Sequence, residues 1–388
     1  MIKKVEISGF KSFRDKTILD FERTKYTGLE KENVKANGVL KGAVFFGSNA
    51  SGKSTILHAI NFMFQLLASN SFINAEQYFC LFAKDKQIKM KYLFDFSGDE
   101  IEYEIECIRE RKNRMCFAEN LTINGELFME RFDNTAKRIE GESKTYFNDI
   151  DREVLFLRTE YFNKGFSQKS INELFEFASN SIYINMFRTR LESSRSNIVL
   201  LRPYLERYGT KKLNAFLEDN NFVHRIKYLK MKSDDKSVSS LTNIENNVIA
   251  IERTDVEKFV VDLEMESDGV MNLFNILPSY LSCMEKGAIL LIDEFCSGFH
   301  NELEELLIRY FFKKSKKSQM FVVTHSTNVL SNTLYRPDQM YKIDFVKGEG
   351  SKVYRVSNNK PRLGQNIEKM YLGNAFGSSK GFINKDGA

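Results

Sequence analysis

One short segment limits what this chain can fold into more than any other feature of its sequence. Residues 47–55 read Gly-Ser-Asn-Ala-Ser-Gly-Lys-Ser-Thr and fit the pattern Gly-x-x-x-x-Gly-Lys-Ser. An apolar, strand-like run at 43–46 precedes the segment, and apolar residues at helical spacing follow it at 56–67. A glycine-rich turn between a strand and a helix directs several backbone N–H groups at an anion without interfering side chains. The segment therefore predicts a loop that binds nucleotide phosphates.

The polar residues of this loop have separate predicted tasks. We expect Lys53 to reach the β- and γ-phosphates, and the Ser54 hydroxyl to hold Mg²⁺. The alternative, a glycine-rich turn with an incidental lysine, is disfavoured by the strand before the loop and the helix after it. The residues predicted to contact the nucleotide from this loop are Gly47, Asn49, Gly52, Lys53, Ser54 and Thr55.

A second motif is an apolar run at 288–292 that ends in Asp293 and Glu294. Ligands of α/β proteins bind at the carboxyl ends of the strands. We expect Asp293 to complete the Mg²⁺ shell with Ser54, and Glu294 to polarise the attacking water as a catalytic residue. Alone, such a run is often an ordinary strand end, but downstream of a phosphate loop it becomes a strong signal.

A third motif, Val322-Val323-Thr324-His325-Ser326, is another apolar strand with a polar end. His325 can hydrogen-bond the γ-phosphate and so distinguish ATP from ADP, which makes it the second predicted catalytic residue. The alternative is a surface histidine close to a helix cap, because Ser326 and Thr327 are good capping residues.

A fourth motif, Glu266-Ser267-Asp268-Gly269-Val270, opens an amphipathic helix. The simplest interpretation is a helix N-cap. The functional interpretation uses the same physics, since an exposed serine hydroxyl and the N-terminal amides of a helix form an anion site. We therefore include Ser267 and Gly269 among the predicted nucleotide-binding residues.

The first half of the chain alternates with the period of β-strands. Residues 5–21 predict a hairpin before the strand of the phosphate loop, and further alternating runs lie at 90–96, 101–107 and 121–123. The last run precedes an Asn124-Gly125 turn, which is typical of hairpins. These runs predict an antiparallel β-lobe beside the nucleotide.

The second half begins with helical spacing from 171 to 229. The polar, serine-rich residues 232–247 then predict a loop. Continuous apolar strands that alternate with helices follow, and this pattern predicts a parallel sheet covered on both faces. The predicted strands lie at 248–251, 259–263, 288–292 and 320–323, with a helix from about residue 268.

Charge and composition exclude little but set useful limits. The chain has 388 residues with 57 basic and 52 acidic side chains, and a net charge of +5 is too mild to require a nucleic-acid partner. No apolar run is long enough to span a bilayer, and the N-terminus lacks a signal-peptide core, so we expect a cytoplasmic protein without a membrane partner. The five cysteines show no Cys-x-x-Cys pair and are expected to be buried free thiols.

Taken together and in this order, the motifs resemble the ATP-binding-cassette head of SMC and RecF-type ATPases, and residues 7–13, Ile-Ser-Gly-Phe-Lys-Ser-Phe, resemble the start of those heads. More narrowly, the chain resembles the stand-alone AAA-type ATP-binding proteins of bacterial abortive-infection and anti-phage loci, the AbiL/RloA type. The residues that carry this resemblance are Asn49–Ser54, Arg336–Gln339 and Asn366–Gly373.

The resemblance implies an α/β fold class, an ABC/SMC-like P-loop ATPase head with an antiparallel β-lobe and an inserted helical subdomain. Its N-terminal part would span 1–165, the helical insertion 166–245, and the C-terminal part 246–388. It also implies ATP and Mg²⁺ as cofactors, and a head-to-tail homodimer or higher oligomer in which Ser267 and Gly269 contact the γ-phosphate in trans. The signature has Asp268 and Val270 where many such heads have glycine and a polar residue.

The function implied is Mg²⁺-dependent ATP binding and hydrolysis that regulates a separate toxic effector, a nuclease or similar protein, in anti-phage defence. One alternative is a RecF- or SMC-like repair ATPase that binds DNA, so nucleic acid stays open as a partner. Another is a structural scaffold held together by ATP with little turnover. The residue of the glutamine loop is not identified by the sequence, because Gln65, Gln77 and Gln87 are candidates without distinguishing context.

Overall fold

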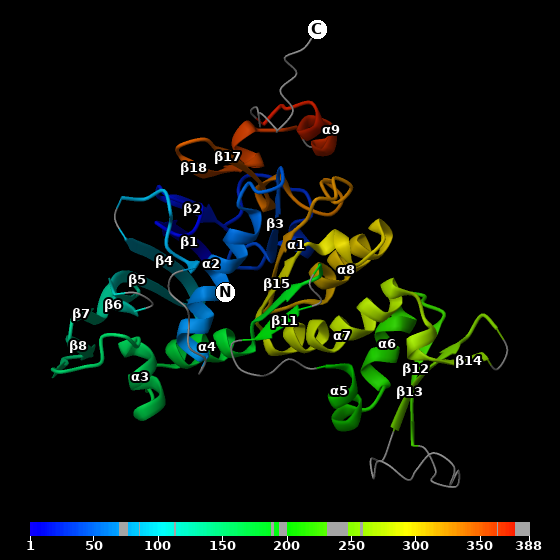
Figure 1. Cartoon of the computed structure of the whole chain (residues 1–388), viewed down its shortest axis with the longest axis horizontal. Helices are drawn as coiled ribbons and strands as arrows, with labels where there is room; N and C mark the ends of the chain where they lie inside the picture. The colour runs from blue at the N-terminus through cyan, green and yellow to red at the C-terminus, as the bar shows by residue number, and fades with distance from the viewer. Residues whose placement is uncertain are drawn as a thin grey trace.

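The computed structural model describes residues 1–69, 77–84, 86–111, 114–187, 190–193, 200–230, 247–256, 259–362 and 364–376. A central sheet separates an antiparallel β-lobe from a region that is mostly helical (Figure 1). Within the described residues, no helix combines the length and the apolar character that crossing a membrane requires. The five cysteines are unpaired, and all but the half-buried Cys296 are buried.

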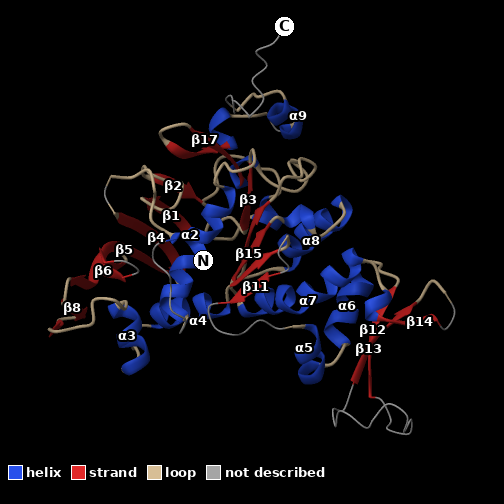
Figure 2. Cartoon of the chain, in the orientation of Figure 1, coloured by secondary structure: helices blue, strands red, loops and turns tan. Residues whose placement is uncertain are grey.

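The central sheet has seven strands in the order β11-β10-β15-β16-β3-β17-β18. The five inner strands, from β10 to β17, run parallel to one another, and the edge strands β11 and β18 pair antiparallel with their neighbours. Figure 2 shows the strands of this sheet in red, among them β3 and β15. Strands β3, β15 and β16 come from the three apolar runs that precede motifs in the sequence analysis. The bounds are β3 Gly42–Phe46, β10 Ile182–Asn185, β11 Arg190–Ser193, β15 Ile289–Asp293, β16 Gln319–Val323, β17 Met340–Val346 and β18 Gly350–Arg355.

Both faces of this sheet are buried, because successive residues of each inner strand point into different hydrophobic clusters. Phe45 and Leu291 belong to the cluster that contains α2 (Lys53–Ala68) and the β-lobe. Val44 and Leu290 belong to the cluster that contains α7 (Asp268–Lys286) and α8 (Asn301–Lys314). A sheet covered on both faces explains why its strands read as continuous apolar runs in the sequence.

The β-lobe is an eight-stranded antiparallel sheet in the order β2-β1-β4-β5-β6-β7-β8-β9. Helix α2 packs against it, and the Tyr92 hydroxyl donates to the Ala59 carbonyl at 2.9 Å. Together with the parallel central sheet, this lobe confirms the α/β fold class expected for an ABC/SMC-like head. The bounds are β1 Ile2–Ser8, β2 Thr17–Asp20, β4 Gln87–Phe96, β5 Asp99–Arg111, β6 Arg114–Ile123, β7 Glu126–Phe132, β8 Thr135–Glu140 and β9 Ser143–Phe147.

The segment expected to be a helical insertion at 166–245 differs from the prediction because it also contains strands, at residues 182–185, 190–193 and 224–230. It contains β10, which pairs in parallel with β15 inside the central sheet. A short apolar run cannot be assigned to strand or helix by its periodicity alone, and Ile182-Tyr183-Ile184 is such a run. Helices α3 (Phe156–Asn163) and α4 (Lys169–Asn180) precede this strand, and α5 (Leu201–Tyr208) and α6 (Lys211–Asp219) follow it.

A third sheet lies beside α6. It has three antiparallel strands, β12 (His224–Lys230), β13 (Asn247–Arg253) and β14 (Phe259–Asp262). The sequence predicted β13 and β14 within two residues of their observed bounds. The loop predicted at 232–247 lies outside the described residues, except for Asn247, which begins β13.

The last described helix lies against the end of β3, where the phosphate loop begins. Helix α9 (Ile367–Leu372) places the Tyr371 ring 5.0 Å from the ring of Phe46, centroid to centroid, at the end of β3. The Thr327 hydroxyl, which follows the Thr-His-Ser motif, donates to the Glu368 carboxylate at 2.6 Å. The remaining short elements are α1 Glu30–Asn33 and the 3₁₀ turns Leu263–Met265, Phe295–Ser297, Pro337–Gln339 and Val356–Asn359.

Candidate active site

The carboxyl ends of four neighbouring parallel strands, β10, β15, β16 and β3, meet at one edge of the central sheet. The strand register aligns Asn185 with Asp293, and Val323 with Phe45. The end of β10, the Asp-Glu pair, the Thr-His-Ser segment and the phosphate loop therefore lie side by side. This edge is where ligands bind in open α/β sheets.

The phosphate loop leaves β3 at Gly47 and enters α2 at Lys53. Gly47 has φ 150°, and a Cβ atom there would lie 2.1 Å from the Ile343 carbonyl oxygen. Gly52, the N-cap of α2, has φ 103°, and a Cβ atom there would lie 2.3 Å from the Ser351 hydroxyl. No other residue type fits these two positions without displacing its neighbours. The loop thus keeps its backbone amides free of side chains at both ends.

The Lys53 ammonium lies inside the loop. Its Nζ donates to the carbonyl oxygens of Gly47 at 3.2 Å and Ser48 at 2.8 Å. Burial lowers the pKa of Lys53, against the opposing effect of the nearby Glu294 and Asp293 carboxylates. A desolvated ammonium at this place is stabilised by any anion that enters the loop. The other predicted loop contacts, Asn49 and Thr55, are exposed and half-buried respectively.

Ser54 and Asp293 lie together, although 239 residues separate them in the sequence. The Ser54 hydroxyl donates to Asp293 Oδ1 at 2.9 Å. Asp293 Oδ2 accepts from the Tyr183 hydroxyl at 2.9 Å and from the Asn185 amide at 3.3 Å. Burial raises the pKa of Asp293, while the bonds from Ser54 and Tyr183 act in the opposite direction. The carboxylate is thus buried but held by hydrogen bonds on both oxygens.

Glu294 and His325 form the outer part of the site. Glu294 Oε1 lies 3.4 Å from His325 Nε2, and both side chains are partly exposed. Glu294 also has φ 55°, in the left-handed region that residues other than glycine, asparagine and aspartate rarely adopt. Backbone strain of this kind gathers at functional sites, because the surrounding structure must hold it in place.

The residues that surround this edge fit a nucleoside triphosphate and Mg²⁺. Serine hydroxyl and aspartate carboxylate oxygens are the hard ligands that Mg²⁺ prefers, and the ion takes its remaining ligands from water and phosphate. The loop offers backbone amides at the N-terminus of α2 and one buried ammonium. Glu294 is a carboxylate at the partly open side, where a water molecule can reach it.

Ser267 and Gly269 lie at the start of α7. Ser267 is the N-cap residue, but its exposed hydroxyl does not cap the helix. A Cβ atom at Gly269 would have no neighbour within 4 Å. Among the described residues, no hydrogen bond joins either of them to the phosphate loop, so within one chain the structure does not bring this motif into the site.

The glutamines considered from the sequence lie elsewhere. Gln65 accepts from the Tyr78 hydroxyl at 3.4 Å, Gln87 in β4 bonds Glu106 of the β-lobe, and Gln77 is exposed in a short turn. The sequence analysis missed Tyr183 and Asn185 on β10, both of which contact Asp293. The signal that could have found them is the pattern of β10 itself, a short apolar run with a polar end like those of β15 and β16.

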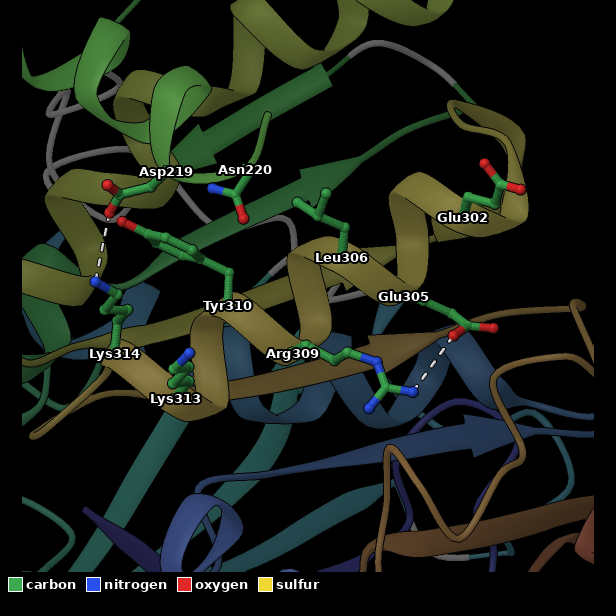
Figure 3. A pocket seen from close by; sticks show the side chains of 9 residues that line it. All are labelled: Asp219, Asn220, Glu302, Glu305, Leu306, Arg309, Tyr310, Lys313 and Lys314. Carbon is green, nitrogen blue, oxygen red and sulfur yellow. Dashed lines mark hydrogen bonds and ion pairs between the residues drawn. The ribbon is translucent and has the colours of Figure 1, made fainter. Parts of the chain in front are cut away.

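A hollow of about 660 Å³ lies between the end of α6 and α8 (Figure 3). Asp219 pairs with Lys314 at 3.4 Å, and Glu305 pairs with Arg309 at 3.5 Å. Side chains of both charge signs line this hollow. None of the predicted site residues is among its lining residues. Its lining is Asp219, Asn220, Glu302, Glu305, Leu306, Arg309, Tyr310, Lys313 and Lys314.

Comparison with known proteins gives one family match. Residues 43–331 match the model of a family described as "AAA domain, putative AbiEii toxin, Type IV TA system". This range includes the phosphate loop, the start of α7, the Asp-Glu pair and His325. No curated protein matches the chain.

Structural comparison finds similarity to several solved structures. The SMC head domain from Thermotoga maritima is 16% identical, with 91% of this chain and 98% of that chain covered and a TM-score of 0.48. An SMC head bound to the C-winged helix domain of ScpA is 16% identical, with coverage of 91% and 96% and a TM-score of 0.49. An SMC head with an extended coiled coil, bound to the C-terminal domain of ScpA derived from Pyrococcus furiosus, is 14% identical, with coverage of 91% and 95% and a TM-score of 0.48.

Proposed function

Because the chain belongs to the AAA-domain family described for the AbiEii toxin and type IV toxin–antitoxin systems, we propose that it is a Mg²⁺-dependent ATPase. One observation carries this proposal. The Ser54 hydroxyl at the start of α2 and the Asp293 carboxylate at the end of β15 lie 2.9 Å apart. A serine after a phosphate-loop lysine and an aspartate after a buried strand form the usual protein ligands for nucleotide-bound Mg²⁺.

Each site residue then has a task. Lys53 would exchange its two carbonyl partners for oxygens of the β- and γ-phosphates, and Ser54 and Asp293 would hold Mg²⁺. When bound, Mg²⁺ supplies neutralisation of phosphate charge. Glu294 would orient the attacking water and accept its proton, and His325, 3.4 Å from Glu294, would contact the γ-phosphate.

The close pair of Glu294 and His325 favours turnover over a purely structural role for ATP. A scaffold needs the phosphate loop and the metal ligands, but it does not need a strained carboxylate beside a histidine.

We further propose that the ATP state of the head controls a separate effector, a nuclease or toxin, in anti-phage defence. In this proposal two chains associate head to tail, and Ser267 and Gly269 of one contact the γ-phosphate held by the other. The exposed hydroxyl of Ser267 and the open surface over Gly269 support it, because both are accessible to a second chain. The family description supports the link to a toxin system.

The substitution Glu294→Gln tests the proposed hydrolysis. It keeps the size of the side chain but removes the base, so ATP binding is expected to persist while single-turnover hydrolysis slows by about 10²-fold or more. Glu302→Gln is the matched control, because Glu302 is an exposed glutamate in the α6–α8 hollow. If Glu294→Gln hydrolyses ATP at the rate of the unmodified protein, Glu294 is not the base and the scaffold alternative is preferred.

A further inference from the structure

A chain of hydrogen bonds connects Asp293 to the N-terminal segment through side chains outside the predicted motifs. The Tyr183 hydroxyl lies 2.9 Å from Asp293 Oδ2. His58 Nε2, on α2, lies 3.1 Å from the same hydroxyl. Lys11 Nζ lies 2.7 Å from His58 Nδ1. Three parts of the fold, the turn after β1, helix α2 and strand β10, thus meet in one line of polar atoms that ends at the proposed metal ligand.

The chemistry of these groups fixes the direction of every bond. A lysine ammonium only donates, so His58 Nδ1 is an acceptor. A neutral imidazole with an acceptor at Nδ1 carries its proton on Nε2, and His58 therefore donates to the Tyr183 oxygen. The Tyr183 hydroxyl accepts from His58 and donates its single proton to the Asp293 carboxylate. One tautomer of His58 and one orientation of the Tyr183 hydroxyl satisfy all of these hydrogen bonds.

The consequence for Asp293 is geometric. Its Oδ2 is occupied by Tyr183 and Asn185, while Oδ1 faces Ser54. A carboxylate fixed on one oxygen cannot rotate freely, so the other oxygen keeps its direction toward the Ser54 hydroxyl. Lys11, at the other end of this series of hydrogen bonds, is also held in place, because its ammonium lies over the Tyr78 ring, 5.2 Å from the ring centroid.

We propose that Tyr183, oriented by His58 and Lys11, is a positioning residue that holds the Asp293 carboxylate for the nucleotide-bound metal ion. This rests on the proposed function, since it concerns the same metal site. Partners that orient a metal ligand typically contribute 10- to 100-fold to metal affinity or activity. The expected signature is a loss of metal affinity without a loss of metal-free nucleotide binding.

The test measures Mn²⁺ binding to the full chain in the presence of ADP, by electron paramagnetic resonance of the free ion. Tyr183→Phe keeps the ring but removes the hydroxyl, and we expect Mn²⁺ affinity to fall about 10-fold or more. ADP affinity measured with a chelator present is expected to stay unchanged. Tyr354→Phe is the matched control, because Tyr354 is exposed on β18 and lies outside this chain of bonds.

Two variants of His58 separate orientation from packing. A glutamine can accept from Lys11 through its oxygen and donate to Tyr183 through its nitrogen, so His58→Gln is expected to keep Mn²⁺ affinity within about threefold. His58→Leu removes the hydrogen bonds to both Lys11 and Tyr183, so its Mn²⁺ affinity is expected to fall as it does in Tyr183→Phe. Circular dichroism spectra establish that each variant is folded.

The outcomes separate this inference from the proposed function. If the unmodified protein binds no nucleotide, the proposed function fails. If it binds nucleotide and Mn²⁺, but Tyr183→Phe binds Mn²⁺ equally well, only the positioning role is overturned. The same holds if Tyr183→Phe loses metal-free ADP binding in parallel, or if His58→Gln and His58→Leu behave alike.

Discussion

Gly52 offers a sharp test of the phosphate loop, because its neighbours are fixed. A Cβ atom at this position would lie 2.3 Å from the Ser351 hydroxyl oxygen and 2.7 Å from that of Ser12. The Ser351 hydroxyl cannot easily move away, since it donates to the Ser51 carbonyl at 2.6 Å and lies 2.8 Å from the Ser12 hydroxyl. Gly52→Ala must therefore shift the loop or break these bonds.

The expected cost can be worked out from these contacts. An alanine held at the φ of 103° found for Gly52 costs about 1–3 kcal/mol. Losing the two hydrogen bonds of Ser351 adds about 1 kcal/mol each. The free loop can relax, but a bound triphosphate requires its original shape, so most of this cost falls on binding. Since about 1.4 kcal/mol corresponds to tenfold in affinity, we expect ATP to bind roughly 100-fold more weakly or worse.

Isothermal titration calorimetry with ATP and Mg²⁺ measures this effect. Gly125→Ala is the matched control, because Gly125 also has a positive φ, 82°, but a Cβ atom there would have no neighbour within 4 Å. This control should bind ATP like the unmodified protein. Unchanged ATP affinity in a folded Gly52→Ala protein would refute the argument that the loop must keep this shape.

Two further predictions concern the proposed dimer and the β-lobe. Ser267→Arg in the Glu294→Gln background is expected to block association of two chains but not nucleotide binding, since a bulky cation opposes the helix dipole at the start of α7. Light scattering with ATP measures the association. Equal association with and without Ser267→Arg would leave Ser267 as a helix N-cap residue only. Glu119→Gln is expected to lower the free energy of unfolding by about 3–5 kcal/mol, because Glu119 is fully buried, pairs with Arg131 at 3.0 Å and accepts from the Phe156 amide at 2.6 Å. Urea denaturation measures the free energy of unfolding. The control Glu130→Gln loses the more exposed pair with Lys137 and should lower this free energy by about 1 kcal/mol or less. Similar losses for the two variants would contradict the prediction.

The parts of the fold that could be predicted from sequence are those whose residue pattern lies within one short stretch of the chain. The phosphate loop, the apolar run before Asp293 and the alternating strands of the β-lobe each carry their pattern within about a dozen residues. Parallel strands bring their carboxyl ends to one edge, so the sequence also indicated that Ser54 and Asp293 would lie close together. Their roles toward ATP and Mg²⁺ stay predictions.

The parts that could not be predicted depend on contacts between distant segments. β10 is only four residues long, and its place next to β15 is decided by pairing, not by a local preference. Tyr183 and His58 look like ordinary residues of a strand and a helix in the sequence, and only the folded chain brings them to Asp293. The same reason left the glutamine candidates unresolved, because Gln65 and Gln87 are distinguished from site residues only by their contacts.

The measurement that tests the central claim most directly is calorimetric titration of ATP and Mg²⁺ into the full chain and into Lys53→Ala. Lys41→Ala is the matched control, since Lys41 is also a buried lysine whose ammonium donates to a carbonyl, that of Phe312 at 2.8 Å. The proposed phosphate site predicts that the unmodified chain and Lys41→Ala bind ATP, and that Lys53→Ala, while folded, does not. Equal ATP affinity for Lys53→Ala and the unmodified chain, or no ATP binding by the unmodified chain, would contradict it.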